Sequence, residues 1–183
     1  MEEIRFHGRG GQGTVVASKV LAVAVANEGN HVQAFPEFGV ERRGAPVVAF
    51  LRIHDNTIYE KSRIYEPDHV VILDPTLLGS VDVTEGLKKG GWVIVNTERN
   101  PDDVPLKVGF RVATVDAYAI AARYGLGSKT SPIVNTAILG AVVKILNLCK
   151  IDSLTGAVED QVPVKKKENV QAARESYANV HGG

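Results

Sequence analysis

Gly8-Arg9-Gly10-Gly11-Gln12-Gly13, called the glycine loop below, lies between an alternating segment at 3–7 and an apolar segment at 14–28. A glycine-rich turn from a first strand into a first helix exposes backbone N–H groups, and the helix dipole there favours an anion. Glycines also let the backbone approach a phosphate closely, where a Cβ would obstruct it. The loop therefore predicts an anion site, to which Arg9 adds a cation and Gln12 a neutral donor.

The spacing Gly8-x-Gly10-x-x-Gly13 also matches the dinucleotide-binding fingerprint. An NAD site needs an acidic residue at the end of the second strand, and Glu37 is the only candidate. Arg42 and Arg43 lie close to that position and favour a phosphate over a bare ribose diol. NAD is therefore kept as the alternative ligand.

Apolar periodicity predicts the other elements of the chain. Strands are expected at 3–7, 32–35, 47–53, 70–73, 92–95 and 111–115, and helices at 14–28, 117–124, 136–148 and, as a polar surface helix, 165–177. We also expect residues 57–59 to return as a hairpin strand and residues 87–91 to end a helix. This alternation predicts a three-layer α/β fold with a mostly parallel sheet and a Rossmann-like first βαβ unit, in one domain spanning 1–183.

Composition excludes several classes of function. The 21 basic and 21 acidic residues balance, which predicts no nucleic-acid or membrane partner. The apolar stretches are too short to span a bilayer, and no signal segment opens the chain, so a cytoplasmic location is expected. Cys149 is the only cysteine, which excludes an internal disulfide and a four-thiolate iron–sulfur cluster, and the five scattered histidines indicate no metal site.

The segment Phe35–Pro46 combines prolines, glycines, aromatic residues and charges, as is typical of a structured loop. In an open α/β sheet it would meet the glycine loop at the carboxyl ends of the strands. A solvated loop in which Glu41 pairs with Arg42 or Arg43 is the alternative. Elsewhere, Asp74-Pro75 is interpreted as a strand terminator, Asn135-Thr136 as a helix cap and Cys149 as a packed side chain.

No catalytic constellation is visible in the sequence. No Ser–His–Asp arrangement and no acidic metal cluster stand out, and no Walker-type lysine follows the glycine loop. An anion site without catalytic groups is typical of a binding subunit within a larger assembly.

GRGGQG at 8–13 together with FPEFGVERRGAP at 35–46 resembles the gamma subunit of 2-oxoacid:ferredoxin oxidoreductases, the pyruvate and 2-ketoisovalerate group. The resemblance extends over most of the chain, at Pro67-Asp68, Leu73-Asp74-Pro75, Leu77-Leu78, Gly86-Leu87-Lys88, Asn96-Thr97, Asn135-Thr136, Gly140-Ala141, Asn169, Ala172-Ala173 and Tyr177. The chain departs from the family at Glu37, often serine there, and at Val40, often proline. These departures concern the detail of one loop.

The resemblance implies an assembly with alpha, beta and delta subunits that oxidatively decarboxylates pyruvate or a related 2-oxoacid. The products are an acyl-coenzyme A, carbon dioxide and reduced ferredoxin. Thiamine diphosphate, Mg²⁺ and the iron–sulfur clusters are expected on the partner subunits and none on this chain, which holds no complete active site. The gamma subunit is expected to help bind coenzyme A.

We therefore expect the nucleotide end of coenzyme A beside Gly8–Gly13, with backbone N–H groups and Arg9 at its phosphates. Arg42 and Arg43 are further phosphate partners or interface contacts. Holding the nucleotide would place the thiol for reaction, a contribution of proximity. Two alternatives stay open: a structural subunit with no ligand of its own, and an NAD-binding Rossmann dehydrogenase.

Overall fold

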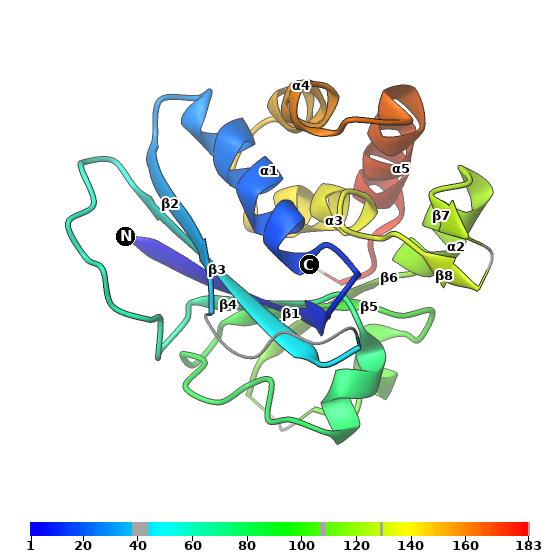
Figure 1. Cartoon of the computed structure of the whole chain (residues 1–183). Helices are drawn as coiled ribbons and strands as arrows, with labels where there is room; N and C mark the ends of the chain where they lie inside the picture. Colours follow the sequence, from blue (N-terminus) through cyan, green and yellow to red (C-terminus); the bar gives the residue numbers. More distant parts are fainter. Residues whose placement is uncertain (38–43, 107–108, 129, 183) are drawn as a thin grey trace.

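A six-stranded sheet organises the molecule (Figure 1). The computed structural model describes residues 1–37, 44–106, 109–128 and 130–182. The strands are β1 (Glu2–Arg9), β2 (His31–Pro36), β3 (Pro46–His54), β4 (His69–Ile72), β5 (Trp92–Asn96) and β6 (Arg111–Val115), in the order β2-β3-β1-β4-β5-β6. β3 runs antiparallel to both of its neighbours, and the other pairs are parallel.

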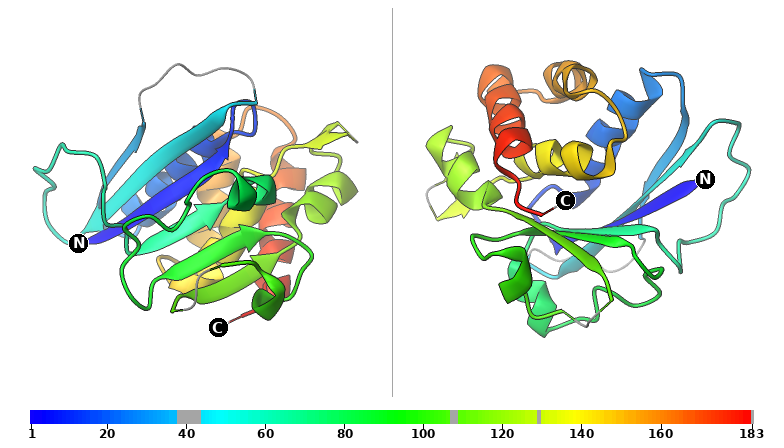
Figure 2. Two further views of the ribbon diagram at one scale, coloured as in Figure 1. Left: turned by 90° about the horizontal axis from the view of Figure 1, so that it is seen from below. Right: turned by 180° about the vertical axis from the view of Figure 1, so that it is seen from behind.

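Helices cover one face of this sheet. They are α1 (Thr14–Ala26), α2 (Ala117–Arg123), α3 (Ala137–Leu146), α4 (Ile151–Gln161) and α5 (Lys166–Asn179). The opposite face carries the short 3-10 helices η1 (Pro75–Gly79) and η2 (Pro101–Asp103), together with irregular segments (Figure 2). A small hairpin, β7 (Gly127–Ser128) and β8 (Ser131–Pro132), lies at the margin. The predicted three-layer, mostly parallel α/β fold is confirmed, with unequal outer layers.

The strand sequences explain the two cores. Along β1, Ile4 and Phe6 point into the core beneath the α-helices, so their alternation marks that face. β4 and β5 are nearly continuous in Val and Ile, because both of their faces are covered. Val70 and Val93, for example, belong to the second core beneath η1.

α5 is more deeply packed than the polar sequence predicts. Val170 and Ala173 are buried, and α5 lies against α3 at Gly140. A Cβ built at Gly140 would lie 1.9 Å from the carbonyl oxygen of Ala173. The predicted surface helix at 165–177 is confirmed, and its inner face is built from small residues that permit close helix approach.

Two local predictions were wrong, and one helix was not predicted. Residues 57–59 form no strand, because β3 already pairs with β1 and β2 and leaves no free edge for a hairpin. Residues 87–91 lie in turns rather than at a helix end, and α4 was not predicted. The predicted first βαβ unit is formed by β1, α1 and β2, whose two strands run parallel with β3 between them.

None of the helices in the described part of the chain has the length and apolar character needed to cross a bilayer.

Candidate functional site

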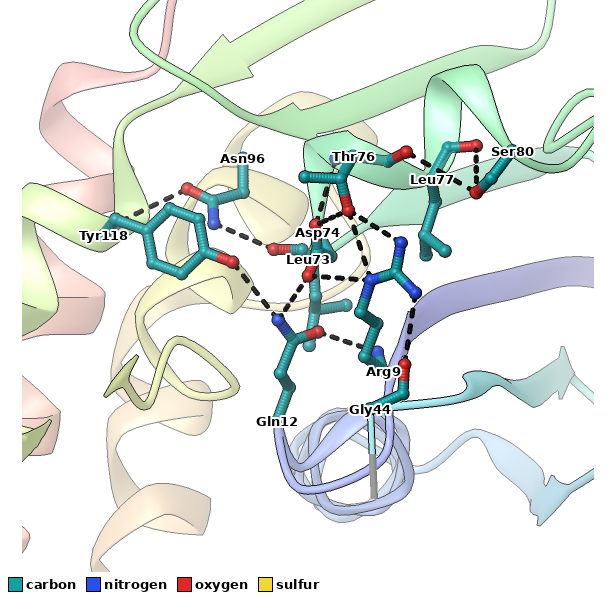
Figure 3. A network of polar contacts seen from close by, with 10 residues as sticks. All are labelled: Arg9, Gln12, Gly44, Leu73, Asp74, Thr76, Leu77, Ser80, Asn96 and Tyr118. Carbon is teal, nitrogen blue, oxygen red and sulfur yellow. Dashed lines mark hydrogen bonds and ion pairs between the residues drawn. The ribbon is translucent and has the colours of Figure 1, made fainter. Parts of the chain in front are cut away.

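The glycine loop lies at the carboxyl ends of the parallel strands, called the carboxyl edge of the sheet, where side chains from several elements converge (Figure 3). His7 of β1 pairs with Ile72 of β4, so the loop that follows β1 lies beside Asp74, which follows β4. η1 and α2 both begin at this edge. The sequence-distant segments 8–13, 74–76, 96 and 118 are thereby brought together, as the topology of parallel strands requires.

Backbone geometry explains the glycines of the loop. Gly11 and Gly13 have φ values of 97° and 79°, in the left-handed region that favours glycine. A Cβ at Gly8 would lie 2.1 Å from Oγ1 of Thr14. The N–H of Gly10 donates to the carbonyl oxygen of Ala45 over 2.9 Å, which ties the loop to the start of β3.

The N-terminus of α1 is arranged to meet an anion. Gly13 is its N-cap residue and supplies no side-chain cap, so the first-turn N–H groups need a partner from outside the helix. Gly11 is exposed, and no described atom lies within 4 Å of where its Cβ would be. A phosphate can therefore approach the backbone here without steric obstruction.

Arg9 is placed at this edge but is partly engaged. Its Nε and Nη2 donate to Oγ1 of Thr76 over 3.1 and 2.8 Å, and its Nη1 donates to the carbonyl oxygen of Gly44 over 3.1 Å. Nε also lies 3.4 Å from Oδ2 of Asp74. A guanidinium has five N–H groups. Among the described residues, one N–H on each terminal nitrogen therefore has no partner, and the side chain is 29% exposed.

Both ends of the Gln12 amide are used within the protein. Its Oε1 accepts from the N–H of Arg9 over 2.7 Å, and its Nε2 donates to Oδ2 of Asp74 over 2.7 Å. Nε2 also lies 3.2 Å from the hydroxyl of Tyr118. The predicted role of Gln12 as a ligand donor stays a prediction, and the geometry gives this residue a role in shaping the loop.

Sequence reasoning missed Asp74, Asn96 and Tyr118. Asn96 links the backbone at the end of β4 to the start of α2, because its Nδ2 donates to the carbonyl oxygen of Leu73 over 2.8 Å and its Oδ1 accepts from the N–H of Tyr118 over 3.2 Å. Burial, and secondarily the charge of Asp74, raises the pKa of Tyr118. Polar residues directly after buried strands are the signal that would have found Asp74 and Asn96.

Asn135 is a further polar neighbour of the loop. A Cβ at Gly13 would lie 2.5 Å from its Nδ2, so the amide lies directly against the N-cap of α1. The predicted capping of α3 by Asn135-Thr136 is not formed through a side chain. Instead, Oδ1 of Asn135 accepts from the N–H of Thr136, whose hydroxyl donates to Oδ1 of Asn169.

Three hollows are lined by residues that adjoin the site. One of about 430 Å³ includes Thr76, Thr97 and Arg99 in its lining. A second, of about 360 Å³, is lined in part by Asn96, Thr97 and Tyr118. On the other side, an apolar hollow of about 250 Å³ lies between Val16 and Asn135.

The acidic residue required for NAD is poorly placed. Glu37 follows β2, and β3 lies between β2 and β1, so the end of β2 is about 10 Å from that of β1 by strand spacing. The Glu37 carboxylate is ion-paired with Arg63. Arg42 and Arg43, the other predicted site residues, lie outside the described residues.

Two further titratable side chains, those of His7 and Cys149, are buried. Burial, helped by the nearby Arg5 guanidinium, lowers the pKa of His7 to about 3. Burial raises the pKa of Cys149 to about 12, so this thiol is packed, as predicted. In the described ranges, no cluster of three or more His, Cys, Asp or Glu side chains is arranged to hold a metal ion.

Comparisons with known proteins show the family of the chain. The family described as pyruvate ferredoxin/flavodoxin oxidoreductase matches residues 3–179. The pyruvate/ketoisovalerate oxidoreductases common subunit gamma of Thermococcus litoralis is 55% identical over 181 residues, which cover 97% of this chain and 96% of that protein. Pyruvate synthase subunit PorC of Methanocaldococcus jannaschii is 49% identical over 178 residues, covering 97% of this chain and 96% of that protein.

Solved structures share the fold. The crystal structure of pyruvate oxidoreductase subunit PORC from Thermotoga maritima is 37% identical and superposes with a TM-score of 0.83, covering 100% of this chain and 98% of that one. The 2-oxoglutarate:ferredoxin oxidoreductase from Magnetococcus marinus, solved with 2-oxoglutarate, coenzyme A and succinyl-CoA bound, matches with a TM-score of 0.74 at 21% identity. The match covers 97% of this chain and 30% of that one, and it shows a shared fold.

Proposed function

The chain belongs to the pyruvate ferredoxin/flavodoxin oxidoreductase family, and on this premise we propose that it acts as the gamma subunit of a 2-oxoacid:ferredoxin oxidoreductase and helps to hold coenzyme A. The whole assembly would convert pyruvate or a related 2-oxoacid and coenzyme A into an acyl-coenzyme A and carbon dioxide, with the electrons passing to ferredoxin. This chain would bind and orient one substrate.

The uncapped N-terminus of α1 behind the glycine loop is the observation that carries the proposal. Phosphates of the nucleotide would accept hydrogen bonds from the first-turn N–H groups and occupy the open space at Gly11. The remaining N–H groups of Arg9 and Nδ2 of Asn135 are further donors at the same place. Arg42 and Arg43 are proposed as additional phosphate partners or as contacts to a partner subunit.

Coenzyme A accounts for these features better than NAD. The NAD alternative needs an acidic residue on a strand next to β1, and Glu37 lies beyond β3. No described group is arranged for hydride transfer or nucleophilic attack. Fixing the nucleotide would let the pantetheine arm deliver its thiol to a reaction centre on another subunit.

The partners follow from the same proposal. Alpha, beta and delta subunits would carry thiamine diphosphate, Mg²⁺ and the iron–sulfur clusters, and ferredoxin would accept the electrons. Cys149 is the only cysteine of the chain and is buried, which supports placing the clusters on the partner subunits, since a cluster needs four thiolates. We place the assembly in the cytoplasm, where coenzyme A and ferredoxin are available.

Two glycines with matched geometry allow a controlled test in the reconstituted complex. Gly11 and Gly29 lie at opposite ends of α1, have φ values of 97° and 95°, and are both exposed with open space at the Cβ position. Gly11→Asp adds a negative charge where a phosphate is proposed, whereas Gly29→Asp adds equal backbone strain and charge elsewhere.

We expect Gly11→Asp to raise the KM for coenzyme A about tenfold or more, from the loss of charge-assisted contacts, and to leave the KM for the oxoacid unchanged. Gly29→Asp is expected to leave both constants unchanged. If the two variants change the KM for coenzyme A equally, the ligand does not bind at the glycine loop, and the alternative of a purely structural subunit is favoured. Nicotinamide-dependent activity of the chain alone would favour the dehydrogenase.

A further inference from the structure

The two carboxylate oxygens of Asp74 have separate tasks (Figure 3). Oδ1 accepts from the N–H and the hydroxyl of Thr76, over 3.0 and 2.6 Å, and thereby starts η1. Oδ2 accepts from Nε2 of Gln12 over 2.7 Å and lies 3.4 Å from Nε of Arg9. One oxygen serves the local turn, and the other faces two side chains of the glycine loop.

The contact of Oδ2 with the glycine loop explains why residue 74 is a carboxylate. Asp74 is only 6% exposed, and burying a carboxylate is unfavourable unless both oxygens are hydrogen-bonded. Asparagine caps a helical turn as well as aspartate does, so Oδ1 alone does not require a charge. An amide nitrogen in the place of Oδ2 would face Gln12 Nε2 and Arg9 Nε, which are both donors. The charge of Asp74 is therefore matched to the glycine loop.

The contact is transmitted to the loop backbone through Gln12. With Nε2 fixed by Asp74, Oε1 of Gln12 accepts from the N–H of Arg9, and the N–H of Gln12 donates to the carbonyl oxygen of Arg9 over 3.0 Å. These two hydrogen bonds join both ends of the turn from Arg9 to Gln12. The hydroxyl of Tyr118, 3.2 Å from Nε2, holds the amide from the other side.

We propose that Asp74 is the positioning residue of the glycine loop: acting through Gln12, it holds the loop in the conformation that presents its N–H groups to a phosphate. This inference rests on the proposed function for its link to coenzyme A. Asp74 itself touches no ligand in this account. Its negative charge lies behind the loop, where it is matched by donors from Gln12, Thr76 and Arg9.

Asp74→Asn tests the proposal in the intact complex, because it keeps the turn with Thr76 and removes the acceptor for the loop. We expect amide hydrogen exchange at 8–13 to accelerate about tenfold, and the KM for coenzyme A to rise by a similar factor, from the loss of one charge-assisted hydrogen bond. The kcat at saturating coenzyme A and the melting temperature should stay near the wild-type values.

Asp116→Asn is the matched control. Asp116 also caps a helix at the carboxyl ends of the strands, where it accepts from the N–H of Ala119 over 2.8 Å. Its substitution by asparagine is expected to leave amide hydrogen exchange in the glycine loop unchanged. In a second variant, Asp74→Asn is combined with Gln12→Glu. The carboxylate introduced at position 12 accepts from both the amide introduced at position 74 and the Arg9 N–H, so exchange protection of the loop should return.

The outcomes separate the positioning role of Asp74 from the proposed binding of coenzyme A at the glycine loop. Unchanged exchange at 8–13 in Asp74→Asn, or no recovery in the double variant, would overturn the positioning role. A parallel fall in kcat and melting temperature, with an unchanged KM for coenzyme A, would show a merely structural residue and also overturn it. Faster exchange at 8–13 with an unchanged KM for coenzyme A, at wild-type kcat and melting temperature, would support the positioning role of Asp74 but contradict the proposed ligand of the loop.

Discussion

Arg9→Ala removes the cationic side chain of the glycine loop. The guanidinium keeps one N–H on each terminal nitrogen after its contacts with Thr76 and Gly44, so it can donate to a phosphate without leaving its place. One hydrogen bond to a charged group contributes about 1.5–3 kcal/mol. Its loss predicts a rise of about 10- to 150-fold in the KM for coenzyme A.

Stability should change little in the same variant. The ion pair with Asp74 is long, at 3.4 Å, and Arg9 is 29% exposed, so solvent screening limits its contribution to below about 1 kcal/mol. Asp74 also keeps its hydrogen bonds from Gln12 and Thr76. A large effect on coenzyme A with a small effect on the melting temperature is therefore expected.

The assay is steady-state oxidation of the 2-oxoacid by the reconstituted complex, with coenzyme A varied. Arg111→Ala is the control, because Arg111 donates to the carbonyl oxygen of Gly90 and stacks on Trp92 at the start of β6, on the opposite edge of the sheet. Arg9→Lys should give an intermediate KM, since it keeps the charge but loses the planar fork. An unchanged KM for coenzyme A in Arg9→Ala would show that Arg9 does not contact the phosphates.

Three further predictions concern stability and reactivity. Gly140→Ala should destabilise the chain by about 1–3 kcal/mol, because the added methyl group overpacks against Ala173. Gly156→Ala, in open space within α4, should be neutral or stabilising. Urea unfolding in which Gly140→Ala is as stable as Gly156→Ala would contradict the packing of α3 on α5. His7 has a pKa of about 3 when folded and 6.5 when unfolded, so only the unfolded chain takes up its proton between these values. Stability should fall as pH drops from 6.5 toward 3, by about 2 kcal/mol at pH 5, and His7→Gln should lose this dependence in acid unfolding. Cys149 should react with a thiol reagent at pH 8 only after unfolding, and fast labelling of the native chain would contradict its burial.

Local chemistry explains which parts of the fold were predictable. The glycine loop, α1 and the strands of the sheet follow from turn residues and apolar runs, and their type was correctly predicted. The placement of β3 between β1 and β2 is not encoded in periodicity, because strand order depends on long-range pairing. α4 was not predicted, although Leu154 and Val158 are spaced as on the apolar face of an amphipathic helix.

The glycine loop is the part of the described site that the sequence predicts. The glycine loop could be recognised because its residues are contiguous and carry a known backbone requirement. Asp74 and Tyr118 are far from it in the sequence and meet it only through the parallel arrangement of β1, β4 and β6. The contact of Gln12 with Asp74 could not be predicted for the same reason, and its role as a donor to a ligand stays a prediction.

A structure of the intact complex with coenzyme A bound is the most direct test of the central claim. We expect a phosphate oxygen of the ligand within about 3.2 Å of backbone nitrogens in the segment from Gly11 to Val16, at the start of α1. Phosphates bound elsewhere in the complex, with this segment facing solvent or a partner subunit, would contradict it.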